Sequence, residues 1–140
     1  TELLVVDMPP GTGDVQLTMI QKHKPAGAVL VSTPQDLALI DAARAGQLFE
    51  QQGVPIIGLV ENMAGYACPH CGQVSDPFGV GGVEAAAGRL GLPFLGRIPL
   101  SLAIRESGDA GAPPAAGDGP DAEPFRAIAA KVAGWLAANE

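Results

Sequence analysis

The sequence predicts an α/β fold in which a parallel sheet is flanked by helices. Short runs of Val, Leu and Ile recur along the chain, and helix-like segments separate them. Strands that alternate with helices form parallel sheets through right-handed crossovers. Many of the 19 glycines and 13 prolines stand singly beside these runs, as turn residues do.

Four apolar runs predict the strands, at residues 3–6, 27–32, 55–60 and 94–98. The first run, LLVV, is too short for a helix and is typical of a strand that is covered on both faces. No capping element precedes it in the sequence. We therefore expect its neighbours in the sheet to be encoded upstream, so that the chain is a fragment.

Helices are predicted between and after these runs. Asp14 is expected to cap a helix over residues 15–22. Further helices are predicted over residues 33–52, 82–90 and 125–138.

Two segments are predicted to be irregular. Residues 61–80 form a long stretch without a regular pattern, and loops of that length in compact domains are usually functional. Residues 110–124, AGAPPAAGDGPDAEP, are rich in Ala, Gly and Pro and are expected to form a mobile loop.

Composition excludes several classes of protein. A length of 140 residues fits one domain, and a net charge of −7 argues against binding nucleic acid or an anionic membrane surface. No apolar run approaches the roughly 20 residues of a membrane span. With only two cysteines, a disulfide-stapled secreted scaffold is not expected. The cytoplasm is the expected location.

Polar residues and turns follow the predicted strands. In open α/β sheets, ligands bind beyond the carboxyl ends of the strands. Asp7, Thr33, Asn62 and Pro99 all lie at such ends. This convergence predicts a binding site.

The segment DMPPGTGD begins at the first of these strand ends. An aspartate at the tip of a buried strand suits Mg²⁺, which keeps several waters and takes few carboxylates. Glycines directly after it let backbone N–H groups approach a phosphate closely. The alternative is an ordinary strand-to-helix turn with a capping aspartate.

This string is similar to the Walker B and switch II segment of the MinD/Mrp group of P-loop ATPases. The resemblance implies a P-loop NTPase (Rossmann-like) fold, of which residues 1–140 would be the C-terminal part. It also implies that Asp7 lies near Mg²⁺ and that Gly11 and Gly13 belong to the switch that senses the γ-phosphate of ATP.

Cys68-Pro69-His70-Cys71 contains the only two cysteines. Two thiolates with this spacing can hold one metal centre, but tetrahedral Zn²⁺ or an iron–sulfur cluster usually needs four ligands. Either a second chain supplies two more thiolates, or the pair is a structural half-site, or it is redox-active. A redox pair of the thioredoxin type would open a helix, whereas the residues after Cys71 read as a loop.

The residues around the cysteines favour the first possibility. ENMAGY before them and FGVGG after them resemble the Mrp/ApbC family of iron–sulfur cluster carriers in order and spacing. The resemblance implies that Cys68 and Cys71 of two subunits hold a bridging four-iron four-sulfur cluster, which is passed to apo iron–sulfur proteins. It gives His70 no ligand role. Zn²⁺ is a possible adventitious substitute in an exposed cysteine pair.

Two strand ends belong to the nucleotide side of this resemblance. The amide of Asn62 can present a donor and an acceptor to an adenine edge. The resemblance implies that role for Asn62, and it places Pro99 beside the base. The alternative for Asn62 is a residue that completes a turn.

The resemblance is incomplete. The glycine-rich phosphate-binding loop of the family and its lysines do not occur in these 140 residues. Nucleotide binding and hydrolysis are therefore not expected of this chain alone. Two other functions stay open, a MinD-like regulatory ATPase and a thiol-disulfide oxidoreductase. The MinD-like reading is disfavoured by the CxxC and by a last helix with only Arg126 and Lys131 as basic residues.

Overall fold

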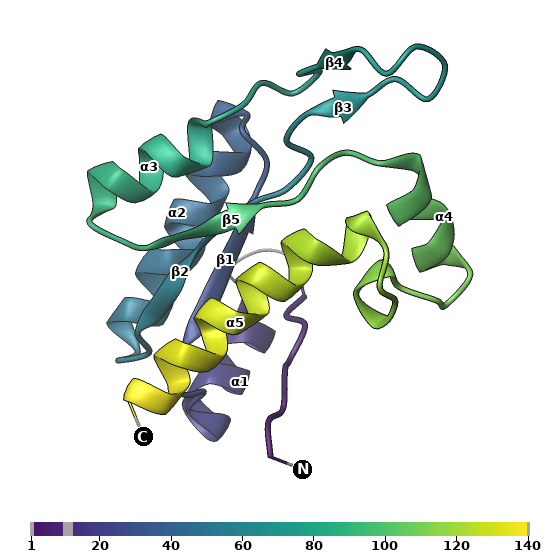
Figure 1. The fold of residues 1–140 in the computed structure, drawn as a ribbon. Coiled ribbons are helices and arrows are strands. Elements are labelled where there is room, and N and C mark those ends of the chain that lie inside the picture. Colours follow the sequence, from purple (N-terminus) through teal and green to yellow (C-terminus); the bar gives the residue numbers. More distant parts are fainter. Residues whose placement is uncertain (1, 10–12, 140) are drawn as a thin grey trace.

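A computed structural model describes residues 2–9 and 13–139 of the chain (Figure 1). In chain order its elements are α1 (Asp14–His23), β1 (Ala28–Ser32), α2 (Asp36–Gln51), β2 (Ile56–Glu61), β3 (Tyr66–Ala67), β4 (Val74–Ser75), α3 (Gly82–Leu90), β5 (Phe94–Arg97), α4 (Leu102–Asp109), the 3-10 helices η1 (Pro114–Ala116) and η2 (Pro120–Ala122), and α5 (Glu123–Ala138).

Three strands form a parallel sheet in the order β1-β2-β5, and β3 pairs with β4 in a separate antiparallel hairpin. Ser32 of β1 is the register partner of Glu61 in β2, and Glu61 is the register partner of Arg97 in β5. The carboxyl ends of the three strands therefore place these three residues side by side.

The sheet has an apolar layer on each face. On one face, α1, α2 and α3 pack through residues such as Ile20, Phe49 and Val83 against Leu30 and Leu59 of the strands. On the other face, α5 covers the sheet (Figure 1), and its Ile128 and Trp135 pack against a cluster that contains Ile57 and Leu95, as does Ile104 of α4. Burial of these aliphatic and aromatic side chains is the main stabilising term of the fold.

The predicted α/β class is confirmed, and three of the predicted strands appear where the apolar runs lie. The predicted strand at residues 3–6 is wrong, so the sheet has three parallel strands rather than four. These residues have no regular structure, and Leu4 and Val5 are 77% and 82% exposed. A strand needs a hydrogen-bonded neighbour, and among the described residues β1, β2 and β5 pair only with one another in the sheet.

Three local features also differ from the sequence prediction. Asp14 is the first residue of α1 rather than its cap, which is Gly13. The helix α4 was not predicted, and its cap is Ser101, whose hydroxyl accepts a hydrogen bond from the Ile104 N–H. Residues 110–124 contain the short helices η1 and η2, which were not predicted, and Ala122 is buried. The mobility of this segment stays a prediction. Within the described residues, no helix is both long and apolar enough to cross a membrane.

Candidate site at the strand ends and the cysteine hairpin

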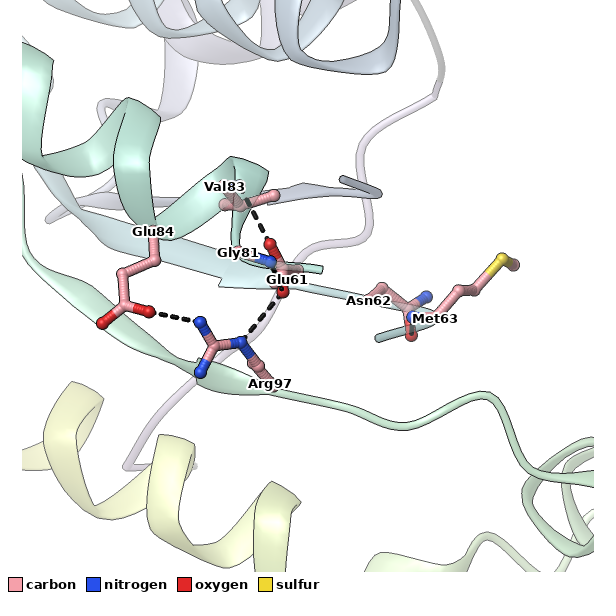
Figure 2. A network of polar contacts seen from close by, with 7 residues as sticks. All are labelled: Glu61, Asn62, Met63, Gly81, Val83, Glu84 and Arg97. Atoms are coloured by element: carbon pink, nitrogen blue, oxygen red, sulfur yellow. Dashed lines mark hydrogen bonds and ion pairs between the residues drawn. The ribbon is translucent and has the colours of Figure 1, made fainter. Parts of the chain in front are cut away.

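A buried carboxylate lies at the centre of the strand ends. Glu61, the last residue of β2, has a side chain that is 0% exposed. Its Oε1 accepts hydrogen bonds from the Gly81 N–H at 3.0 Å and from Arg97 Nε at 2.9 Å, and its Oε2 accepts one from the Val83 N–H at 2.9 Å (Figure 2). Every partner is a donor, so both oxygens of this buried carboxylate are hydrogen-bonded.

Arg97 connects this buried group to the surface. Its side chain is 39% exposed, and its guanidinium also pairs with Glu84 of α3 (Figure 2). The guanidinium carbon lies 5.1 Å from the ring centroid of Phe94. The hydrogen bond to Glu61 raises the pKa of Arg97 above its ordinary value, and Glu84 adds to the effect. Arg97 therefore keeps its charge over the whole physiological pH range.

Asn62 leaves the sheet directly after Glu61. Its N–H donates to Ser32 O at 2.8 Å, and its Oδ1 accepts from the Met63 N–H at 2.9 Å. Met63 has a φ of +57°, so the chain turns sharply here. Figure 2 shows Asn62 and Met63 beyond Glu61, on the side away from Glu84. The Asn62 Oδ1 is engaged by the backbone, and no hydrogen bond among the described residues engages its Nδ2.

Pro99 lies against the same segment from the other side. Glu61 O accepts from the Ile98 N–H at 2.8 Å, and Ile98 O accepts from the Ala64 N–H at 3.0 Å. The Leu100 N–H then donates to Gly65 O at 2.9 Å. These bonds join the chain after β5 to the chain after β2, so Asn62 and Pro99 stand on two directly paired backbone segments.

The two cysteines lie at the tip of the β3–β4 hairpin, which projects beyond the strand ends (Figure 1). The Cys68 N–H donates to Gln73 O at 3.0 Å, and Cys68 O accepts from the Gly72 N–H at 2.8 Å. Gly72 has a φ of +72°, which glycine adopts without strain. The cysteines are free; Cys71 is exposed and Cys68 is half-buried.

Backbone donors converge on the Cys68 sulfur. A hydrogen bond from the His70 backbone, followed by contributions from the backbone and side chain of Cys71, lowers the pKa of the Cys68 thiol. A thiolate is the form that binds metal. The residues after Cys71 enter a turn and then β4, not a helix, so the loop predicted from the sequence is present and a thioredoxin-type helix start is not.

The hairpin offers only part of a metal shell. Across residues 2–9 and 13–139, no group of three or more His, Cys, Asp and Glu side chains could hold a metal ion. Cys68 and Cys71 therefore have no third ligand among the described residues. His70 belongs to no such group among these residues.

Among the described residues, no hydrogen bond or ion pair joins the predicted switch residues Asp7 and Gly13 to the strand ends. Asp7 is exposed in the segment of residues 2–9, and no hydrogen bond or ion pair among the described residues connects it to Asn62 or to Glu61. Gly13 is the N-cap of α1, and its carbonyl accepts from the Leu17 N–H at 3.2 Å. Gly11 lies outside the described residues.

Sequence reasoning missed Glu61 and Arg97 as members of the site. A glutamate that ends the apolar run PIIGLV was the available signal for Glu61, because a charge on a fully covered strand needs a partner. No comparable signal marked Arg97, since its pairing depends on the register of β5 with β2.

Comparison with known proteins identifies the fold and the family. The family model described as "ParA: NUBPL iron-transfer P-loop NTPase" matches residues 1–133. A nucleotide-binding protein from Archaeoglobus fulgidus, solved in complex with ADP, is similar with a TM-score of 0.66 and 40% identity, over 75% of this chain and 43% of that one. The cell division ATPase MinD of Pyrococcus furiosus is similar with a TM-score of 0.58 and 26% identity, over 79% of this chain and 43% of that one.

Curated relatives carry iron–sulfur names. The Arabidopsis thaliana "Iron-sulfur protein required for NADH dehydrogenase, mitochondrial" is 53% identical over 112 residues, which are 80% of this chain and 36% of that protein. The iron-sulfur cluster carrier protein of Pseudomonas fragi is 49% identical over 117 residues, 84% of this chain and 41% of that protein. The carrier of Methanocaldococcus jannaschii is 42% identical over 132 residues, 94% of this chain and 46% of that protein.

The chain thus spans between 36% and 46% of the length of these relatives. The residues matched by the family model, 1–133, include the DMPPGTGD segment, the cysteine hairpin and all three strand ends. The family resemblance predicted from DMPPGTGD and CPHC is confirmed. The chain belongs to the ParA family of NUBPL iron-transfer P-loop NTPases.

Proposed function

We propose that the chain is the cluster-holding part of an iron–sulfur cluster carrier, and that Cys68 and Cys71 bind the cluster as cargo. The observation that carries this proposal is the pair of free thiols on a projecting hairpin, with backbone donors on the Cys68 sulfur. Exposure allows a cluster to enter and leave, and thiolate character allows it to bind. The names of the relatives support the same role.

The cargo in this proposal is a four-iron four-sulfur cluster that bridges two copies of the chain. Such a cluster takes four cysteine ligands, and one copy offers two. Two hairpins that meet at their tips complete the shell, since nothing else in the described part of one copy supplies the remaining donors. The proposed assembly is therefore a homodimer with the cluster on its two-fold axis.

ATP with Mg²⁺ is the proposed regulator of the full-length protein. Asp7 would lie near Mg²⁺, Gly11 and Gly13 would belong to the γ-phosphate switch, and Asn62 and Pro99 would border the base. The ADP complex of the Archaeoglobus fulgidus relative supports a nucleotide role. The phosphate-binding loop does not occur in these 140 residues, so the phosphates need partners from elsewhere in the protein.

Apo iron–sulfur proteins are the proposed recipients of the cluster. The thiol pair must stay reduced to accept cargo, which fits a reducing compartment such as the cytoplasm. Capture of Zn²⁺ by the same thiols during aerobic preparation would be adventitious.

Anaerobic reconstitution with iron and sulfide tests the proposal. The wild-type protein is expected to hold iron and sulfide in equal amounts, and the Cys68→Ser, Cys71→Ser double variant is expected to hold neither. His70→Ala is the matched control, because it changes the same turn and removes no sulfur. Cluster binding that survives in the double variant would defeat the assignment.

A further inference from the structure

The cysteine hairpin belongs to a long excursion of the chain whose two ends meet at one side chain. Residues 62–80 leave the sheet after Glu61 and return at Gly81 and Val83, where α3 begins. Both returning N–H groups donate to the Glu61 carboxylate, at 3.0 Å and 2.9 Å (Figure 2). The start and the end of the excursion are therefore fixed to the same residue.

The start of α3 depends on this arrangement. Its N-cap is Gly81, which has a φ of +80° and no side chain that could cap the helix. The first N–H groups of a helix need acceptors when they are withdrawn from water. Here the acceptor is Glu61, which is about 20 residues earlier in the sequence and ends the strand β2. Most helices are capped by a local Ser, Thr, Asp or Asn, whereas α3 takes its acceptor from β2 and is thereby joined to the sheet.

Arg97 extends the same connection to β5. Its Nε bonds Glu61 at 2.9 Å, and the next residue, Ile98, returns a backbone bond to Glu61 O at 2.8 Å. Ile98 O in turn accepts from the Ala64 N–H, at the base of the hairpin. In this ion pair, Glu61 directly precedes Asn62, and Arg97 is two residues before Pro99. The pair therefore lies at the base of the hairpin.

We propose that Glu61 and Arg97 are positioning residues that hold the cysteine hairpin in a fixed orientation to the strand ends that carry Asn62 and Pro99. Neither residue touches the cargo. Their action passes through the paired backbone of residues 61–65 and 98–100 and through the start of α3. The proposal deepens the proposed function, and it rests on that function for the role of the thiols.

Arg97 is the residue of this pair that can be replaced with the least disturbance of the core. Arg97 is 39% exposed, so Arg97→Gln removes the ion pair without emptying a buried site. Arg105→Gln is the matched control: Arg105 also forms two ion pairs, with Glu106 and Asp109, but on the exposed surface of α4. Arg97→Lys keeps the charge and is expected to restore part of any loss.

Hydrogen exchange of single amides separates positioning from general destabilisation. In Arg97→Gln, the Ala64 and Leu100 amides are expected to exchange at least about tenfold faster, while the Leu59 amide in the core of β2 keeps its rate. In Arg105→Gln, all three amides are expected to keep their rates. Equal acceleration of all three in Arg97→Gln, or none, would overturn the proposal.

Cluster release provides the functional arm. In anaerobically reconstituted full-length protein, an iron chelator is expected to bleach the cluster of Arg97→Gln several-fold faster than that of wild type, at unchanged initial iron content. The positioning proposal would also be overturned if Arg97→Gln showed faster exchange at Ala64 but an unchanged rate of cluster bleaching. If the wild-type protein takes up no cluster, the proposed function fails, and the exchange experiment still decides whether Glu61 and Arg97 position the hairpin.

Discussion

Arg97 places its Nε 2.9 Å from Oε1 of the fully buried Glu61, and the two residues are register partners at the ends of β5 and β2. A buried carboxylate is destabilising unless each of its oxygens has a donor. The register of the sheet supplies one donor from β5, and the first turn of α3 supplies the other two. The ends of the sheet and the base of the cysteine hairpin are therefore stabilised together.

Replacement of Arg97 by glutamine is expected to lower the free energy of unfolding by about 1–3 kcal/mol. The estimate lies below that for breaking a fully buried pair, because Arg97 is partly solvated and two backbone donors to Glu61 remain. Urea unfolding measures the change. Arg105→Gln should stay within about 0.5 kcal/mol of wild type. Equal losses of unfolding free energy in both variants would show that the Arg97 ion pair contributes no more than a surface pair.

Replacement of Glu61 by alanine is expected to be more destabilising than Arg97→Gln, by about 3–5 kcal/mol relative to wild type. Two backbone donors and the partly exposed Arg97 then lose their acceptor, and the side chain leaves a cavity. Glu61→Gln keeps the volume but turns one acceptor into a donor, so an intermediate loss is expected. Chemical unfolding of the three variants should reproduce this order, and a Glu61→Ala variant as stable as Arg97→Gln would contradict it.

A close backbone contact at the start of α3 can be tested with two glycines of the same helix. A Cβ at Gly82 would lie 2.5 Å from the carbonyl oxygen of Pro34, whereas a Cβ at Gly88 would meet nothing within 4 Å. Gly82→Ala is expected to destabilise the protein by about 1–3 kcal/mol because the backbone must move. Gly88→Ala is expected to stabilise it by about 0.5–1 kcal/mol. Thermal unfolding that shows the same sign for both would refute the contact.

The Cys68 thiol gives a prediction for pH dependence in the cluster-free protein. Its pKa is lowered in the folded chain, first by the His70 backbone bond and then by Cys71. The thiolate therefore favours the folded state; this contribution is complete above the ordinary thiol pKa of 9.0 and is lost as the pH falls through the lowered value.

Alkylation of Cys68 should report this shift directly. Iodoacetamide labelling, resolved by site with mass spectrometry, is expected to show a lower pH midpoint for Cys68 in native buffer than in urea, because only the thiolate reacts. Identical midpoints in the two conditions would show that the backbone donors do not act on the sulfur.

Local sequence signals predicted most of the fold. The apolar runs at residues 27–32, 55–60 and 94–98 became β1, β2 and β5, because each has a neighbour in the sheet. The run at residues 3–6 is at least as apolar, and without a paired neighbour it is not a strand. Propensity is local, whereas a hydrogen-bonded ladder depends on other segments.

The same distinction applies to the site. CPHC could be recognised because its chemistry is contained in four consecutive residues. The Glu61–Arg97 pair could not, since it depends on strand register and on contacts between residues that are 36 positions apart. The proximity of Asn62 and Pro99 was predictable in outline from the topology of parallel strands, but the backbone bonds that join their segments were not.

Native mass spectrometry of the anaerobically reconstituted protein tests the central claim most directly, because it counts chains, iron and sulfide in one particle. If each hairpin supplies half of the coordination shell, the spectrum should show a species of two chains with one four-iron four-sulfur cluster. This species should dissociate into single chains when the cluster is removed or when Cys68 and Cys71 are replaced. A cluster bound in full by one chain would contradict the account.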